Sequence, residues 1–536
     1  MNLKNYFQRL VAKKAVAIIS RFISLHLAVS QGDTSALKFA KVIRILHAGD
    51  IEKRGGNRKR YNQFMAISCL QSLFLLEKWV LAFCNTEQEI SPIQPQEWII
   101  MMNALLAIND RLPGEEVVGH ETEYLYLTAY YNSSKSIKHQ IARSFYVYST
   151  LLNQDPNTTP FLQTYKAIKG FSIEDRLSCL FNSLGNTFPN YTIQGMSIVS
   201  LATKINNFDA RGLKSVYNAV IDSLRINYLD AKRAALRSIN QVWNFECFYR
   251  YPFVRIDDLQ FPFSQPSIVY QMWEGLYWNV RYAFPEDGEE FMTQFGKPFE
   301  HYIQEITKAS VCIAQQKVLF QNEFHYTFMK ENKASSDCYF RIGNDLFAIE
   351  AKAKSPHSKT LTEVDRASID TEVEDLMINP IIQVTARLNE INSVTSGIGK
   401  DILSFFSGVE KTIILVVSME KVQPVGELLL KLDRGIQAGI QDLNIVAYHN
   451  VNIEEYEAIC NLIEICPLEL ANILTDWFSD QRKDIRSIVI LANYLHTAQK
   501  PFSCSSYVSI LFDKAMDDIY KRTFNKERPL NLPTST

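Results

Sequence analysis

The residues of this chain whose types and spacing best suit chemistry are Asp337, Glu350 and Lys352. The apolar runs between them are interrupted at Gly343-Asn344, which predicts a β-hairpin with a tight turn. Side chains i and i+2 of a strand share a face, so Glu350 and Lys352 point the same way. Folding the hairpin back brings Asp337 roughly opposite Glu350, although a slip of one residue in register would change its facing.

Two carboxylates and an ammonium group in one small patch indicate a metal-assisted reaction. Neighbouring carboxylates repel each other, and one of them tends to keep its proton unless a divalent cation takes oxygen ligands from both. Magnesium binds through one or two carboxylates plus substrate phosphate, and its bound water is easier to deprotonate. The Lys352 ammonium can hold the attacking water or stabilise the pentavalent phosphate. The patch therefore predicts phosphodiester hydrolysis with Mg²⁺ or Mn²⁺ as the cofactor.

The acidic residue, the hairpin and the Glu-x-Lys triplet resemble the PD-(D/E)xK nuclease superfamily, which shares a restriction-endonuclease-like core. The resemblance covers about residues 285–460. It implies that Asp337 and Glu350 hold the metal and that Lys352 acts on water or phosphate. One departure is Ser336, which stands where the family name has a proline, at a position that varies widely within the superfamily.

Segments on both sides of the hairpin extend the resemblance. Upstream, residues 296–302 look like the start of a helix whose Glu300 resembles the acidic residue on the first core helix of many members. Glu300 is thereby implied to bind a second metal or to orient water. Downstream, Asn379 suits the N-cap and Pro380 the first position of a helix. The resemblance implies that Gln383 on this helix completes the site.

The same downstream helix carries a polar stripe. Gln383, Arg387 and Glu390 follow one another at i, i+4 and i+7 and therefore share one face. We expect Arg387 to contact nucleic acid from this stripe.

Length and composition indicate a multidomain globular protein. The chain has 536 residues, of which 47% are hydrophobic and 21% charged, and it exceeds what one hydrophobic core normally supports. Helical spacing dominates residues 1–284, alternating helices and strands follow over 285–465, and helical spacing returns over 466–536. We expect a helical recognition region, an α/β nuclease domain with a central mixed sheet flanked by helices, and a helical extension.

The sequence favours a cytoplasmic protein. It contains no window of about twenty uncharged apolar residues, which argues against a membrane span. Its nine cysteines are an odd number and form no paired CxxC motif, which is typical of reduced thiols rather than disulfides or zinc sites.

Nucleic-acid contacts are expected from local basic residues, because the net charge of −2 does not itself indicate such a partner. The strongest cluster lies in a loop containing Gly55 and Gly56 and comprises Lys53, Arg54, Arg58, Lys59 and Arg60. These cations can neutralise phosphates in a salt-sensitive, sequence-independent way, but a solvated surface loop is an equally good interpretation. Lys354, just past the catalytic strand, is expected to line the substrate groove.

The resulting hypothesis is a metal-dependent endonuclease acting on DNA. Fusion to a large helical region resembles effectors of prokaryotic antiviral defence, an inference by analogy alone. The helical region would recognise substrate, a partner protein or a second copy, and a homodimer would supply two sites for the two strands of a duplex. Two alternatives stay open: a catalytically inactive nuclease-fold scaffold or interaction protein, and a nuclease that cleaves RNA.

Overall fold

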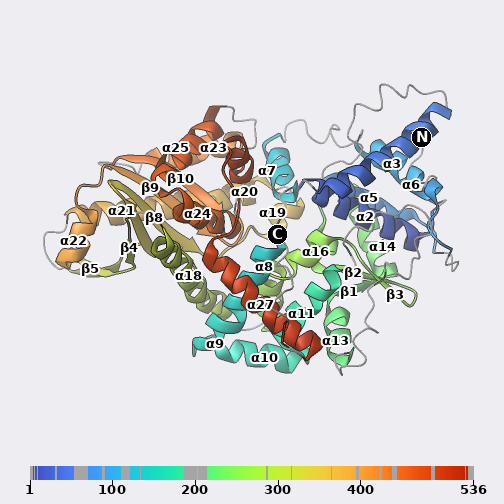
Figure 1. Cartoon of the computed structure of the whole chain (residues 1–536), viewed down its shortest axis with the longest axis horizontal. Coiled ribbons are helices and arrows are strands. Elements are labelled where there is room, and N and C mark those ends of the chain that lie inside the picture. The colour runs from blue at the N-terminus through green and yellow to red at the C-terminus, as the bar shows by residue number, and fades with distance from the viewer. Residues whose placement is uncertain are drawn as a thin grey trace.

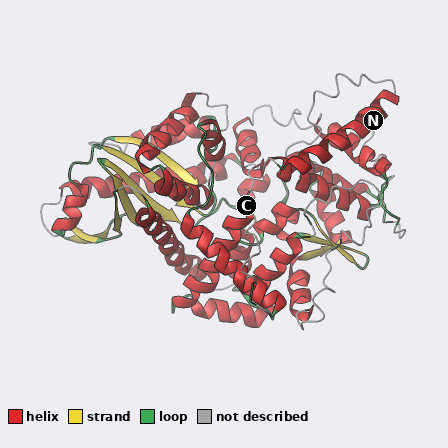
Figure 2. Ribbon diagram, viewed as in Figure 1, coloured by secondary structure: helices red, strands yellow, loops and turns green. Residues whose placement is uncertain are grey.

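Helices make up most of the fold, and the largest sheet lies in the C-terminal half of the chain (Figures 1 and 2). The computed structural model describes residues 4, 7–8, 10–30, 33–53, 70–86, 91–109, 121–132, 135–185, 187, 202, 214–284, 288–314, 317–363, 365–393, 398–421, 425–437, 443–483, 489–525 and 527–528. All structural statements below refer to these residues.

The N-terminal half is built from helices and one small sheet. Its helices are α2 (Ala12–Ser30), α3 (Thr34–Lys53), α5 (Leu70–Phe83), α6 (Pro95–Asn109), α7 (Glu121–Asn132), α8 (Ile137–Ser144), the π-helical η2 (Phe145–Leu151), α9 (Leu152–Gln154), α10 (Thr159–Lys169), α11 (Ile173–Leu184), α13 (Lys214–Leu224), α14 (Tyr228–Arg237), α15 (Glu246–Arg250), α16 (Gln265–Tyr270) and α17 (Glu274–Arg281). The helical character expected here is confirmed. The small sheet of β1 (Arg225–Asn227), β2 (Phe253–Ile256) and β3 (Leu259–Pro262) was not expected from the sequence.

The C-terminal half alternates helices and strands. Its elements are α18 (Gly288–Ile313), β4 (Val318–Asn322), β5 (His325–Phe328), β6 (Glu331–Ala334), β7 (Cys338–Ile342), β8 (Asp345–Lys352), α19 (Ser358–Glu363), α20 (Arg366–Val373), the π-helical η4 (Glu374–Ile378), α21 (Asn379–Ser393), α22 (Lys400–Phe406), β9 (Lys411–Ser418), α23 (Glu427–Gln437), β10 (Ile445–Asn452), α24 (Ile453–Ile465), α25 (Pro467–Lys483), α26 (Leu491–Thr497) and α27 (Ser506–Phe524).

The five-stranded sheet is mixed and has the order β10-β9-β8-β7-β4. Strands β8, β9 and β10 run parallel, whereas β7 is antiparallel to both β8 and β4. Seven of the eight residues of β9 are buried. Such burial is expected for a parallel strand covered on both faces, and it agrees with the continuous apolar run in the sequence.

Helices cover both faces of this sheet. Leu346 and Ala348 of β8 belong to one apolar cluster together with Val384 of α21. Phe347 of β8, which points to the other face, belongs to a second cluster together with Ile303 of α18. The sheet therefore lies between a helical layer containing α21 and one containing α18 (Figure 1).

Both clusters continue into the N-terminal half of the chain. The first includes Trp98 of α6, and the second includes Tyr148 of η2. The second cluster also includes Phe512 of α27, from the C-terminal extension. Helix α27 packs against α8, so the C-terminal extension covers the N-terminal half rather than standing apart (Figure 1). The division at residues 284 and 465 stays a prediction.

Two helix starts expected from the sequence are wrong. Helix α18 begins at Gly288, not near Gly296, and carries Pro298 in its interior. A proline inside a helix costs about 3 kcal/mol, but Phe295 and Phe299 on either side are fully buried and hold the helix in place.

Asn379 is likewise not an N-cap, because it has helical backbone angles and directly continues η4. The π-helical turn of η4 lies immediately before Pro380. Proline lacks an N–H group and its ring clashes with the preceding turn, and a π-bulge is one way in which a helix accommodates that disruption.

Candidate active site

The hairpin of β7 and β8 brings the expected acidic pair together. Cys338 of β7 pairs with Ile349 of β8, so the next position of the same register places Asp337 opposite Glu350. The turn consists of Gly343 and Asn344, and Gly343 has a φ of 60° that favours glycine. The register inferred from the turn in the sequence is confirmed.

Arg341 fixes this turn against the neighbouring segment. Arg341 is 9% exposed, and its guanidinium group donates to the backbone oxygens of Gly343 (2.6 Å), Phe405 (2.7 Å) and Ser407 (2.6 Å). A planar group with donors on several sides suits such a cluster of carbonyls. Arg341 therefore restrains the hairpin whose register positions the acidic pair.

Glu350 is a buried carboxylate with a cation on each oxygen. It is 3% exposed. Lys352 Nζ lies 2.8 Å from its Oε1, and Arg387 Nη1 of α21 lies 2.7 Å from its Oε2. Lys352 thus lies on the same face as Glu350, as the strand alternation predicts.

Asp337 is held by its backbone and its side chain. Its carbonyl oxygen accepts from Gln304 Nε2 (2.9 Å) and from the Glu323 backbone N–H (3.0 Å). Its Oδ2 accepts from the Ala351 backbone N–H at 2.6 Å. Burial raises the pKa of Asp337 well above its usual value, and the charges of Glu350 and Glu300 raise it further. This carboxyl group therefore favours a proton or a cation.

Glu300 of α18 adds a third carboxyl group to the neighbourhood. Its side chain is partly buried, and burial followed by the charges of Glu323 and Glu350 raises its pKa. Lys352 opposes that effect. Asp337, Glu350 and Glu300 therefore interact electrostatically, as expected if they serve one site.

The predicted polar stripe of α21 divides into three environments. Gln383 is exposed, and its role in the site stays a prediction. Arg387 reaches Glu350, so in this structure its guanidinium group serves the site rather than the surface. Glu390 accepts from Lys333 (2.6 Å) and from Tyr326 (2.7 Å). Both hydrogen bonds lower the pKa of Glu390, and the one from Lys333 has the larger effect.

The predicted nucleic-acid residues are only partly described. Lys53 is the exposed last residue of α3. Lys354 is exposed just past β8, near the candidate site. The remaining cations of the basic loop, Arg54, Arg58, Lys59 and Arg60, lie outside the described residues.

The donor set fits a hard divalent cation that keeps some of its water. No group of three or more His, Cys, Asp and Glu side chains within the described ranges is already arranged as a metal cage. The raised pKa of Asp337 nevertheless means that a cation beside it would relieve repulsion. A metal held by Asp337 and Glu350 would share Glu350 with the cations of Lys352 and Arg387.

Sequence reasoning missed two positioning residues. Gln304, which holds the Asp337 carbonyl, follows Glu300 by four residues on α18, so helical spacing was an available signal. Arg341 carried no local signal, because the carbonyls of Phe405 and Ser407 that it contacts lie more than sixty residues away in sequence.

The comparisons with known proteins do not place the chain in a family. A scan against protein-family models, a search of curated proteins and a search of solved structures each find no match. Within the described part of the chain, no helix combines the length and apolar character needed to cross a membrane.

Proposed function

We propose that the protein is a metal-dependent nuclease that hydrolyses phosphodiester bonds, with its active site on the β7–β8 hairpin. The observation that carries the proposal is the register that sets Asp337 opposite Glu350, with Lys352 paired to the same carboxylate. A buried acidic pair with an adjacent ammonium is costly unless it serves a ligand or a reaction.

The arrangement of elements supports this proposal. A helix (α18) precedes a β4–β7–β8 antiparallel group, a helical segment (α20–α21) leads to the parallel strand β9, and α23 leads to the parallel strand β10. This order resembles that of the restriction-endonuclease-like core, with the candidate residues at the corresponding elements. Such a likeness bears on fold, and the function rests on the site residues.

Each proposed role follows from a contact. Asp337 and Glu350 would hold Mg²⁺ or Mn²⁺, which, when bound, polarises the phosphate and makes water easier to deprotonate. Lys352, which already lies 2.8 Å from Glu350, would hold the attacking water or neutralise the charge that develops on phosphate. The raised pKa of Glu300 makes this carboxylate a better proton acceptor for that water.

DNA is the substrate class that we propose, with internal cleavage. The exposed Lys354 at the end of the catalytic strand would contact the backbone near the scissile phosphate. Backbone contacts of this kind do not distinguish sequences, so we propose no sequence preference.

Incubation of the full chain with plasmid, single-stranded DNA and tRNA tests the proposal. We expect cleavage of plasmid with Mg²⁺ or Mn²⁺, and no cleavage with EDTA. Lys352→Ala should abolish cleavage without unfolding the chain, because Lys352 is partly exposed and leaves no core cavity. Lys354→Ala removes the same charge two residues away and should retain cleavage with weaker binding. Equal cutting by Lys352→Ala and the parent would contradict the role of Lys352, and cleavage of tRNA alone would replace DNA by RNA.

One observation favours a second candidate, an inactive nuclease-fold scaffold. Lys352 and Arg387 each pair with one oxygen of Glu350, so the chain itself supplies the positive charge that compensates this carboxylate. Binding of nucleic acid without cleavage under every metal condition would favour this scaffold.

A further inference from the structure

A second candidate site, separate from the nuclease centre, lies where strands β9 and β10 end. A cavity of about 630 Å³ is lined there by the chain that follows these strands, by the start of α8 and by α17. Its lining includes Glu420 after β9, Glu454 of α24 and Gln140 of α8. Cavities outside the carboxyl ends of parallel strands are common ligand sites in α/β proteins.

Carboxylates and cations alternate on the wall of this cavity. Lys135 forms ion pairs with Glu274 and, at 2.7 Å, with Glu420. Lys421 pairs with Glu455 at 2.5 Å. The three carboxylate partners of these two lysines all lie on the wall of the cavity, and none of them is more than 5% exposed.

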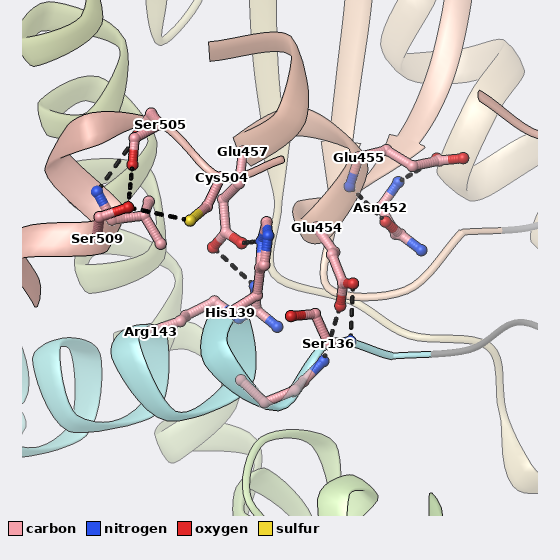
Figure 3. A network of polar contacts seen from close by, with 12 residues as sticks. Ser136, His139, Arg143, Asn452, Glu454, Glu455, Glu457, Cys504, Ser505 and Ser509 are labelled. Carbon is pink, nitrogen blue, oxygen red and sulfur yellow. Dashed lines mark hydrogen bonds and ion pairs between the residues drawn. The ribbon is translucent and has the colours of Figure 1, made fainter. Parts of the chain in front are cut away.

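Glu454 differs from these residues because no cation pairs with it directly in the described structure. Its Oε1 accepts from the Ser136 backbone N–H at 2.8 Å (Figure 3). Its Oε2 accepts from Gln140 Nε2 at 3.4 Å. Burial raises its pKa above the usual value. Neutral donors thus hold a carboxyl group that a cation in the cavity would stabilise in its charged form.

A neighbouring cluster, whose Arg143 also lines the cavity, compensates Glu454 only in part. Burial raises the pKa of Glu454 more than the charges of His139 and Arg143 lower it, so the pKa stays raised. Glu457 accepts from Arg143 at 2.7 Å and pairs with His139 at 2.5 Å (Figure 3). It also accepts from the Tyr302 hydroxyl at 2.6 Å. Arg143 also lies over the ring of Trp273, 4.8 Å from its centre. Across wall and cluster, five carboxylates face the two lysines, Arg143 and His139. Two further histidines, His26 and His496, line the cavity, and burial lowers the pKa of His26.

Gln140 provides an independent sign of a missing ligand. The residue is 2% exposed, lines the cavity and gives its N–H to Glu454. Its Oε1 is buried and has no hydrogen-bond partner among the described residues. An unpaired buried acceptor is costly, about 1–3 kcal/mol, and a donor in the cavity would remove that cost.

The remaining wall selects among cationic ligands. Leu27, Leu70 and Met419 give it apolar patches that suit methylene groups better than a hydrated metal ion. A phosphate group is disfavoured by the carboxylates and by the start of α24, where the Asn452–Glu455 capping box already pairs the backbone N–H groups of these two residues.

We propose that this cavity binds an aliphatic polyamine, with one ammonium group at Glu454 and Gln140 and the methylene chain along the apolar patch. The proposal does not depend on the nuclease function, because it involves none of the residues assigned to that site.

Calorimetric titration of the full chain with spermidine, at constant ionic strength, tests this proposal. We expect saturable binding at one site, weakened about tenfold by Glu454→Gln, which removes the charge but keeps an acceptor. Glu469→Gln, an exposed carboxylate on α25 outside the cavity, is the matched control and should leave binding unchanged.

A second pair of variants avoids any effect on folding. Asn493 is an exposed residue at the cavity rim. Asn493→Asp should strengthen and Asn493→Lys weaken spermidine binding, each by about two- to fivefold. The same changes at Asn153, which is exposed on α9 and outside the cavity, should have no effect. Absence of saturable binding, or binding that ignores both Glu454→Gln and the sign of charge at position 493, would overturn the proposal.

Discussion

Arg387 of α21 and Glu350 of β8 form an ion pair of 2.7 Å that joins the helical layer to the β7–β8 hairpin. Both side chains are largely shielded from water, with 20% and 4% of the side-chain surface exposed. Arg387 occupies the oxygen of Glu350 that Lys352 does not, so it stands where a metal would compete for the same carboxylate.

Removing this competitor should strengthen metal binding. We expect Arg387→Gln to bind Mn²⁺ about fivefold more tightly, because one positive charge leaves the neighbourhood of the cation. Arg387→Lys keeps the charge and should change the affinity less. Titration of Mn²⁺ followed by electron paramagnetic resonance measures both. Weaker Mn²⁺ binding by Arg387→Gln would show that Arg387 orients the Glu350 carboxylate for the metal rather than competing with the metal for it.

Neutralising Asp337 should stabilise the fold and abolish cleavage. Its folded-state pKa is raised by burial and by Glu350 and Glu300, so the folded state holds the proton more tightly than the unfolded state. Stability is therefore lost as the pH rises above the unfolded-state value. Asp337→Asn escapes this loss and still accepts from the Ala351 N–H.

Thermal unfolding without metal checks this prediction. At pH 8, Asp337→Asn should melt about 1–3 °C above the parent, and the difference should shrink in acid. Asp345→Asn, at the other end of the hairpin, is the control. A lower melting temperature for Asp337→Asn would contradict the account of its environment.

Glu372 predicts a further pH dependence. Burial raises its pKa to about 7, although it accepts from the His357 backbone N–H (2.5 Å) and from Thr360 Oγ1 (2.7 Å). The folded state therefore binds this proton more tightly. Its stabilising effect is complete below the unfolded-state pKa and is lost as the pH rises through about 7.

The variant Glu372→Gln should remove this dependence. Its urea midpoint should exceed that of the parent at pH 8, with a smaller difference at pH 5. Glu469→Gln serves as the exposed control. An equal difference in urea midpoint at pH 5 and pH 8 would mean that a change in packing, not in protonation, distinguishes the variant from the parent.

The hydrogen bonds from Arg341 to backbone carbonyls should stabilise the fold. Arg341→Lys replaces a guanidinium group that contacts four carbonyl groups with one ammonium, so we expect a loss of about 2 kcal/mol. Arg255, which donates to the Asp257 carbonyl at 2.9 Å from a more exposed position, is the matched control. Denaturant unfolding compares the stability of Arg341→Lys with that of Arg255→Lys. Equal losses of unfolding free energy would contradict the role of Arg341 in restraining the hairpin.

The sequence was informative where structure depends on neighbours in the chain. The turn at Gly343-Asn344 was sufficient to set Asp337 against Glu350, because a two-residue turn fixes hairpin register. The continuous apolar run of residues 413–417 likewise predicted the buried strand β9. These features require no knowledge of distant segments.

Prolines misled where packing outweighed local preference. Pro298 and Pro380 suggested helix starts, yet buried contacts carry α18 through the first, and a π-helical turn accommodates the second. The small sheet was missed because β1 pairs in parallel with β2, more than twenty residues further along the chain. The ion pair of Arg387 with Glu350 depends on how α21 packs on the sheet, which no local pattern reveals.

The most direct test of the central claim is anomalous scattering from crystals of the full chain soaked in manganese. The account predicts a peak between the side chains of Asp337 and Glu350 in the parent and none in Asp337→Asn. No peak there in the parent, or a peak that persists unchanged in Asp337→Asn, would contradict it.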